Sequence, residues 1–78
     1  MIELMYRYLQ NAGYEYIDKN DELRDYASSI DIVLLICYLE NQLNISIPDE
    51  DTYIFSKNIV MIEDYLKKLM NKNSSKIS

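Results

Sequence analysis

The chain contains a single glycine, Gly13, and a single proline, Pro48, among its 78 residues. Few positions are therefore suited to a left-handed turn or to breaking a helix. Since 49% of the residues are hydrophobic, the chain also has enough apolar side chains for one core. This composition favours helices over a turn-rich sheet, and the length favours one small domain with a thin margin of stability.

In the first segment the apolar residues follow the i, i+3, i+4, i+7 spacing of one helical face. They are Ile2, Met5, Tyr6 and Leu9. Gly13 stands where a helix commonly ends in a left-handed residue. A polar connector follows over residues 14–22, and we expect Tyr14, Tyr16 and Ile17 to anchor this loop on the core.

The second helix is expected to begin at Ser28, a favourable N-cap, with Asp31 reaching back to it as a short variant of the capping box. Its apolar stripe comprises Ile30, Val33, Leu35, Ile36, Leu39 and Leu43. Asn44 is a suitable stop, and Pro48 prevents the helix from continuing beyond it. We expect residues 45–47 to form an extended loop whose isoleucines enter the core.

A short third helix is expected over residues 52–55, because Asp49, Glu50 and Asp51 favour the positive end of a helix dipole. The same acidic run lacks the ligand spacing and central glycine of a calcium loop. The last helix, capped by Asn58 or Ser56, has an apolar face of Ile59, Ile62, Tyr65, Leu66 and Leu69.

These elements predict an all-α fold. We expect a small four-helix bundle, with three main helices, a short third helix and a long first loop. The bundle occupies residues 1–70, and a flexible polar tail is expected over residues 71–78.

The chain carries 13 acidic and 8 basic residues, for a net charge of −5. An acidic surface without a basic stripe argues against nucleic-acid binding and favours partners with basic docking faces. No stretch approaches the roughly 18 consecutive apolar residues of a membrane span. The first residues also lack the basic and apolar regions of a signal peptide, so we expect a cytoplasmic protein without membrane contact.

Histidine is absent and Cys37 is the only cysteine. The chain therefore cannot build a Cys/His metal site or an intrachain disulfide, and it suits a reducing compartment. No nucleophile–base pair can be assigned, so we expect a protein without a metal and without catalytic activity of its own.

Two short segments follow each other at a fixed spacing: Pro48 lies 19 residues after Ser29. The first segment reads Ala27-Ser28-Ser29-Ile30-Asp31-Ile32-Val33, and the second reads Ile47-Pro48-Asp49-Glu50. This set resembles the acyl and peptidyl carrier proteins. That family reads Asp-Ser-Leu-Asp-x-Val at the start of its second helix and Ile-Pro-Asp-Glu before its short third helix. The approach over residues 21–26 and the last helix over residues 59–66 also resemble the family, so the likeness covers about residues 1–70.

The resemblance implies that Ser29 is the attachment point of a 4′-phosphopantetheine arm, transferred from coenzyme A by a phosphopantetheinyl transferase. It further implies a free-standing, monomeric carrier that holds an acyl or aminoacyl group as a thioester. Loading enzymes and downstream enzymes of fatty-acid, polyketide or nonribosomal-peptide biosynthesis would be its partners. The position is physically suitable, because a hydroxyl at a helix start faces solvent beside free amides that favour a phosphate.

The chain departs from the family at Ser28, where the family has Asp; serine replaces the helix cap but not the charge. Leu34, Cys37 and Tyr38 form an apolar strip where the family often carries carboxylates. The residues expected to contact partners are Ser28, Ile30, Asp31, Leu34, Cys37 and Tyr38.

Two other interpretations stay open. The Ser28-Ser29 pair can be a plain helix start, since serine caps are common. The chain can also be a helical interaction module that has the carrier fold without an arm and binds its partner through the strip at Leu34.

Overall fold

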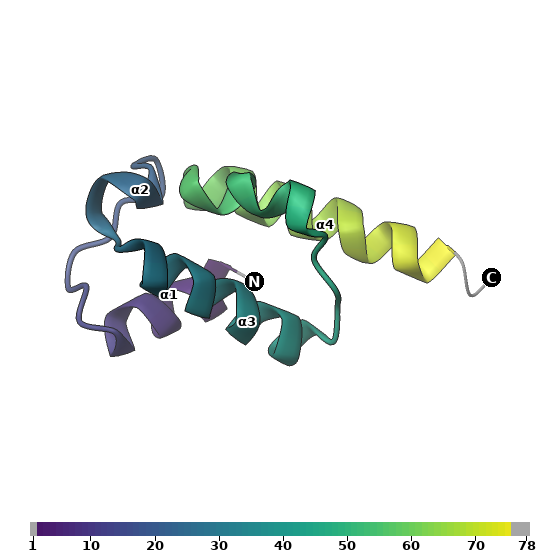
Figure 1. Cartoon of the computed structure of the whole chain (residues 1–78), viewed down its shortest axis with the longest axis horizontal. Coiled ribbons are helices and arrows are strands. Elements are labelled where there is room, and N and C mark those ends of the chain that lie inside the picture. The colour runs from purple at the N-terminus through teal and green to yellow at the C-terminus, as the bar shows by residue number, and fades with distance from the viewer. Residues whose placement is uncertain (1, 76–78) are drawn as a thin grey trace.

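The computed structural model describes residues 2–75, and within this range the chain forms five helices and no β-strand (Figure 1). They are α1 (Ile2–Asn11), α2 (Leu23–Tyr26), α3 (Ser29–Leu43), the 3-10 helix η1 (Asp49–Ser56) and α4 (Ile59–Ser75). The predicted all-α class is therefore confirmed. No helix in residues 2–75 has the length and apolar character needed to cross a membrane.

The described helices share one core. α1 packs against α3 and α4, and η1 packs against the same two helices, while α2 lies at one end against α3 and η1 (Figure 1). Every helix contributes to the fully buried residues, which are Met5, Leu9, Leu23, Leu35, Leu39, Phe55, Ile59, Ile62 and Leu66. Fully burying an aliphatic or aromatic side chain contributes about 1.5–3 kcal/mol, so this shared core is what holds the short helices together.

The predicted helix ends are confirmed at three positions. Gly13 has a positive φ of 107°, and the adjacent Tyr14 N–H donates to Leu9 O at 3.0 Å, so α1 ends in a left-handed residue. Asn44 ends α3 in the same way, with φ 53° and ψ 50°. At the start of α4, Asn58 Oδ1 accepts from Met61 N at 2.9 Å, which identifies Asn58 as the cap.

The first connector, residues 14–22, contains no helix, as predicted, but a short helix that we did not predict, α2, follows it before α3. Leu23 is fully buried and its N–H donates to Lys57 O at 3.1 Å, which ties α2 to the turn before α4. Tyr14 and Ile17 pack against the core as expected. Tyr16 is 84% exposed, so its predicted role as an anchor is wrong.

The segment between α3 and η1 is extended, as predicted. Ile47 is 6% exposed and Ile45 packs against the core, so both isoleucines contribute to it. The Ile47 N–H donates to Glu40 Oε2 at 2.8 Å, which holds this segment along α3. The short third helix is present but longer than expected, because η1 begins at Asp49 and includes the acidic residues.

α4 continues to Ser75 and its end extends past the other helices (Figure 1). Residues 71–75 are therefore part of α4, and the flexible tail that we expected from residue 71 stays a prediction. This stretch contains no glycine or proline, so nothing in it interrupts the backbone hydrogen bonds of the helix. The rest of the expected tail, residues 76–78, lies outside the described residues.

Candidate functional site at the start of helix α3

Ser29 is the first residue of α3, and it is exposed. Ser28 caps the helix: its Oγ accepts from Asp31 N at 3.1 Å and its carbonyl accepts from Ile32 N at 3.0 Å. The cap uses the Ser28 hydroxyl, so the predicted helix start is confirmed. The neighbouring Ser29 hydroxyl takes no part in this cap and remains at the surface.

The expected capping box is wrong in one respect. The Asp31 carboxylate does not return to the Ser28 amide. Instead, the hydroxyl of Tyr14 donates to Asp31 Oδ2 at 2.5 Å and accepts from Ser28 N at 3.2 Å. The Tyr14 hydroxyl thus binds both Ser28 and Asp31, and it holds the first connector against the start of α3. The sequence indicated that Tyr14 anchors the connector, but spacing alone could not show that its hydroxyl binds Asp31 and Ser28.

A hollow of about 300 Å³ lies beside Ser29, between α2, α3 and η1. Its polar side is formed by Arg24, Thr52 and Ser56, and its apolar side by Ile32, Val33 and Ile36. Arg24, Thr52 and Ser56 were not expected at this site, because Arg24 belongs to α2 and the other two belong to η1, which is far along the chain from Ser29. The fold brings them to the same hollow as Ser29.

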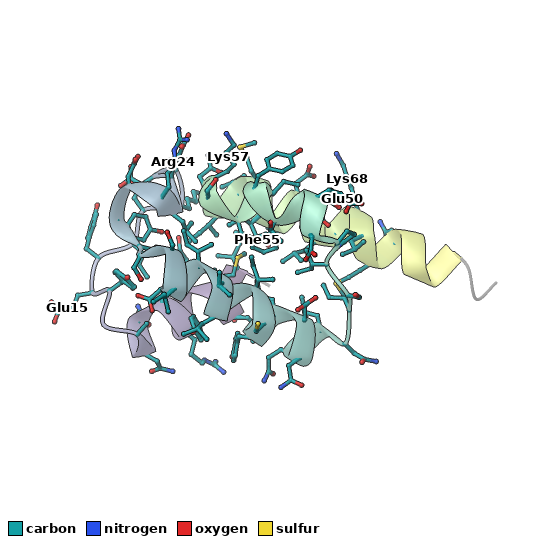
Figure 2. The ribbon with its side chains drawn as sticks, viewed as in Figure 1. Glu15, Arg24, Glu50, Phe55, Lys57 and Lys68 are labelled. Carbon is teal, nitrogen blue, oxygen red and sulfur yellow. The ribbon has the colours of Figure 1, made fainter. Side chains whose placement is uncertain are left out.

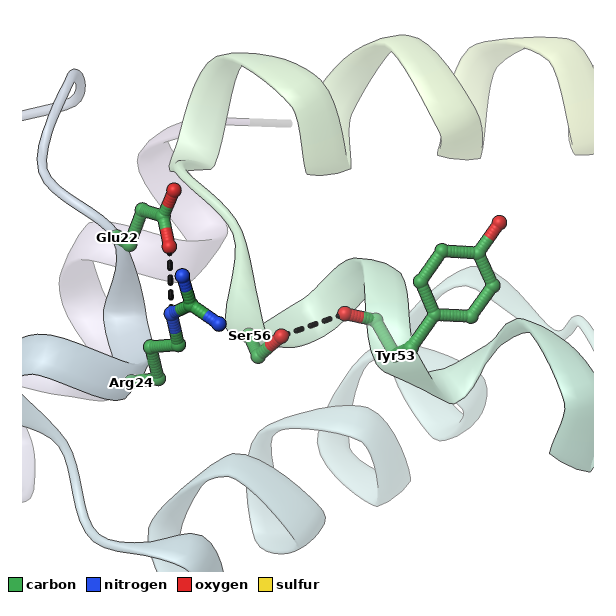
Figure 3. Close-up of polar contacts among 4 residues, drawn as sticks. All are labelled: Glu22, Arg24, Tyr53 and Ser56. Carbon is green, nitrogen blue, oxygen red and sulfur yellow. Dashed lines mark hydrogen bonds and ion pairs between the residues drawn. The ribbon is translucent and has the colours of Figure 1, made fainter.

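The polar side of this hollow has defined donors and acceptors. Arg24 Nε lies 2.7 Å from Glu22 Oε1 in an ion pair, and Figure 3 shows its guanidinium reaching toward Ser56. The hydroxyl of Ser56 donates to Tyr53 O at 2.7 Å (Figure 3). The hydroxyl of Thr52 donates to Asp49 O at 2.8 Å. Their protons are committed to the backbone, so both oxygens can only accept from a ligand. Arg24 supplies a positive charge, which its ion pair with Glu22 partly balances.

An apolar face adjoins Ser29 on its other side. Ile30 is 72% exposed, Val33 57% and Leu34 47%, and with Ser29 they line a second hollow of about 220 Å³. We expected Ile30 and Val33 in the buried stripe, and this is wrong. At 100° per residue, Leu35 and Leu39 fix the buried side of α3 and place Ile30 opposite to it.

The strip predicted at Leu34, Cys37 and Tyr38 is only partly exposed. Leu34 and Cys37 face outward. Tyr38 is half-buried, because its ring packs against Tyr8 of α1 with 4.9 Å between the ring centroids. Burial, and to a smaller degree the Asp31 carboxylate, raises the pKa of Tyr8. Tyr38 therefore belongs to the contact between α1 and α3, and the exposed apolar face is formed by Ile30, Val33 and Leu34.

The two carboxylates of α3 are both engaged within the protein. Asp31 accepts from the Tyr14 hydroxyl, and Glu40 accepts from the Ile47 amide. Neither can approach a basic partner with both oxygens free. In the part of the chain that the structure describes, no three acidic or cysteine side chains come together as metal ligands would.

The fold and this site define a small all-α protein with an exposed serine at a helix start, flanked by an apolar face and a hollow with one arginine. Comparison with protein-family models, with curated proteins and with solved structures finds no match.

Proposed function

We propose that this chain is a carrier protein in which Ser29 holds a 4′-phosphopantetheine arm. The observation that carries the proposal is the exposed Ser29 hydroxyl at the first position of a 15-residue helix, beside a hollow that contains Arg24. Helix starts favour phosphate, because their first amides lack partners within the helix and the helix dipole is positive there. The ordered match to the carrier motifs points to the same serine.

The residues around Ser29 suit the parts of such an arm. The guanidinium of Arg24 would pair with the phosphodiester, as arginine does with phosphates. The hydroxyl oxygens of Thr52 and Ser56 would accept from the amide groups of the pantetheine. When attached, the arm supplies a thiol that carries an acyl or aminoacyl group as a thioester. The chain's own residues bind and orient the arm and do no chemistry on its cargo.

The proposal also names partners. A phosphopantetheinyl transferase would modify Ser29, and loading and downstream biosynthetic enzymes would contact the exposed face of Ile30, Val33 and Leu34. The helices around the shared core would serve as the bundle of a monomeric carrier. The exposed Cys37 suits a reducing, cytoplasmic setting for these enzymes.

The test is a mass measurement. The protein is incubated with coenzyme A and a phosphopantetheinyl transferase of broad specificity, and intact mass spectrometry records the product. We expect a gain of one arm in the wild type and in Ser46→Ala, which removes another exposed serine, and no gain in Ser29→Ala. Ser28→Asp keeps the cap and adds the family's carboxylate, so it should react faster. The proposal fails if the wild type gains no mass or if Ser29→Ala gains as much.

The presence of Ser28 where carrier proteins have Asp favours a second candidate. In that case the chain is a helical interaction module without an arm, which binds a protein through the face around Leu34. Partner binding would then survive Ser29→Ala and be lost in Leu34→Asp. A wild type that the transferase leaves unmodified, together with this pattern, would replace the first proposal by the second.

A further inference from the structure

A groove of about 550 Å³ lies between η1 and α4, away from Ser29. Three of its side chains are apolar and well exposed: Tyr53 at 64%, Val60 at 42% and Met61 at 50%. None of the residues that line it also lines the two hollows at Ser29. The groove is therefore a separate surface, which the carrier proposal does not use.

The walls of the groove are fixed. The hydroxyl of Tyr65 on α4 donates to Asp51 Oδ2 on η1 at 2.7 Å. The Tyr65 ring also meets Phe55 edge to face, with centroids 6.0 Å apart, and Phe55 is fully buried. Both contacts join η1 to α4, so the groove is preformed. The two helices need not become ordered when a partner binds. Preformed sites cost less to bind, since less conformational entropy is lost.

The groove carries two lysines and one carboxylate, that of Asp64, although the chain as a whole is acidic. Lys57 lies in the turn before α4 and Lys68 lies on α4, and both project from the same long side of the molecule (Figure 2). Lys57 makes no ion pair with any side chain in the described range. Lys68 pairs with Asp64 at 3.1 Å, but both side chains are largely exposed and such pairs contribute little.

We propose that the groove between η1 and α4 binds an amphipathic helix of a partner protein, with its apolar face on Met61 and its carboxylates toward Lys57 and Lys68. Helices dock in such grooves through anchors at i, i+3 or i+4 and i+7. Lys57 lies just before α4, and from Ile59 to Lys68 the helix rises roughly 14 Å over nine positions, so the carboxylates belong about three turns apart. Methionine and tyrosine suit a protein partner, because Met adapts its shape and Tyr is common in interfaces.

A helix fits the groove better than a small molecule does. Small ligands bind where most of their surface becomes enclosed, and they need a deep site. Here Tyr53, Val60 and Met61 keep between two fifths and two thirds of their surface exposed, so the groove is open. Because the surface is separate from Ser29, a partner could hold the protein here while the start of α3 remains accessible.

The test is a selection from a displayed library of helical peptides, with the full-length protein as target. We expect the enriched peptides to combine apolar residues at i, i+3 or i+4 and i+7 with Asp or Glu. One of them, labelled with fluorescein, is then titrated by anisotropy. Met61→Asp and Val60→Ser should weaken binding, the former about tenfold or more. Lys57→Glu should weaken it several-fold, and binding should fall as salt rises. Leu34→Asp, on the other exposed apolar face, is the matched control and should leave the affinity within twofold.

Four results would overturn the proposal. The first is no enrichment, and the second is enrichment of basic peptides. The third is binding that Leu34→Asp abolishes and Met61→Asp leaves intact. The fourth is a dimer in sedimentation velocity that Met61→Asp dissociates, since the groove would then hold a second copy of this chain. Circular dichroism of each variant separates a lost contact from a lost fold, and Val60→Ser replaces Met61→Asp if the latter unfolds.

Discussion

Although Tyr14 lies in a loop, its hydroxyl should contribute substantially to the free energy of unfolding. The substitution Tyr14→Phe removes this hydroxyl and keeps the ring. In the wild type it donates to the half-buried Asp31 carboxylate at 2.5 Å and accepts from the exposed Ser28 amide at 3.2 Å. A hydrogen bond to a charged group contributes about 1.5–3 kcal/mol, whereas the exposed amide can bind water instead. We therefore expect a loss of about 2 kcal/mol, from a total of roughly 4–12 kcal/mol for a domain of this size.

Urea denaturation followed by circular dichroism measures the free energy of unfolding, and a thermal scan should show a melting temperature lower by roughly 8–16 °C. Tyr16→Phe is the matched control, because Tyr16 belongs to the same connector and is 84% exposed. It should change the stability by less than about 0.5 kcal/mol. If the two variants unfold at the same urea concentration, Tyr14 does not hold the connector to α3.

Three further outcomes are expected. Tyr26→Phe should raise the free energy of unfolding by about 1 kcal/mol in urea denaturation, because the Tyr26 hydroxyl is buried without a hydrogen-bond partner among the described residues. Asn58→Ala should lower it by about 1 kcal/mol through loss of the cap on Met61 N, whereas Ser46→Ala should not. Burial raises the pKa of Tyr26 to about 12, and burial with the Asp51 hydrogen bond raises the pKa of Tyr65. Folding therefore favours the neutral hydroxyls, so the free energy of unfolding should be constant in this respect below about pH 10 and should fall as pH rises toward 12. Urea midpoints across this range should fall less in Tyr26→Phe than in wild type.

The ends of the helices were predictable because they depend on residues close in sequence. Gly13 and Asn44 take left-handed conformations that few other residues adopt easily. Ser28 caps an amide only three residues away, and so does Asn58. In each case the donor and acceptor are fixed by the local backbone, so the residue type was enough to identify the position.

The polar side of the candidate site was not predictable, because it depends on contacts between distant segments. Tyr14 meets Asp31 across 17 positions of sequence, and Arg24 reaches the hollow of Ser29 only because α2 packs on α3. The apolar residues of α3 posed a different difficulty. The segment from Ile30 to Leu39 is hydrophobic on nearly every side, so the sequence could not show that Ile30 and Val33 remain exposed.

The net charge of −5 suggested a partner with a basic docking face, but the charges around the start of α3 favour a different kind of contact. A carboxylate attracts a basic partner strongly when both oxygens are free, and Asp31 and Glu40 each use one oxygen inside the protein. Drawing either toward a partner would weaken the hydrogen bond to Tyr14 or to the Ile47 amide. Recognition beside Ser29 would therefore depend on burial of apolar side chains, which salt does not screen. At the groove between η1 and α4 the charges of Lys57 and Lys68 are screened over about 8–10 Å at moderate salt. A rise in salt concentration should thus distinguish the two proposed surfaces: it should weaken binding at the groove and leave binding beside Ser29 unchanged.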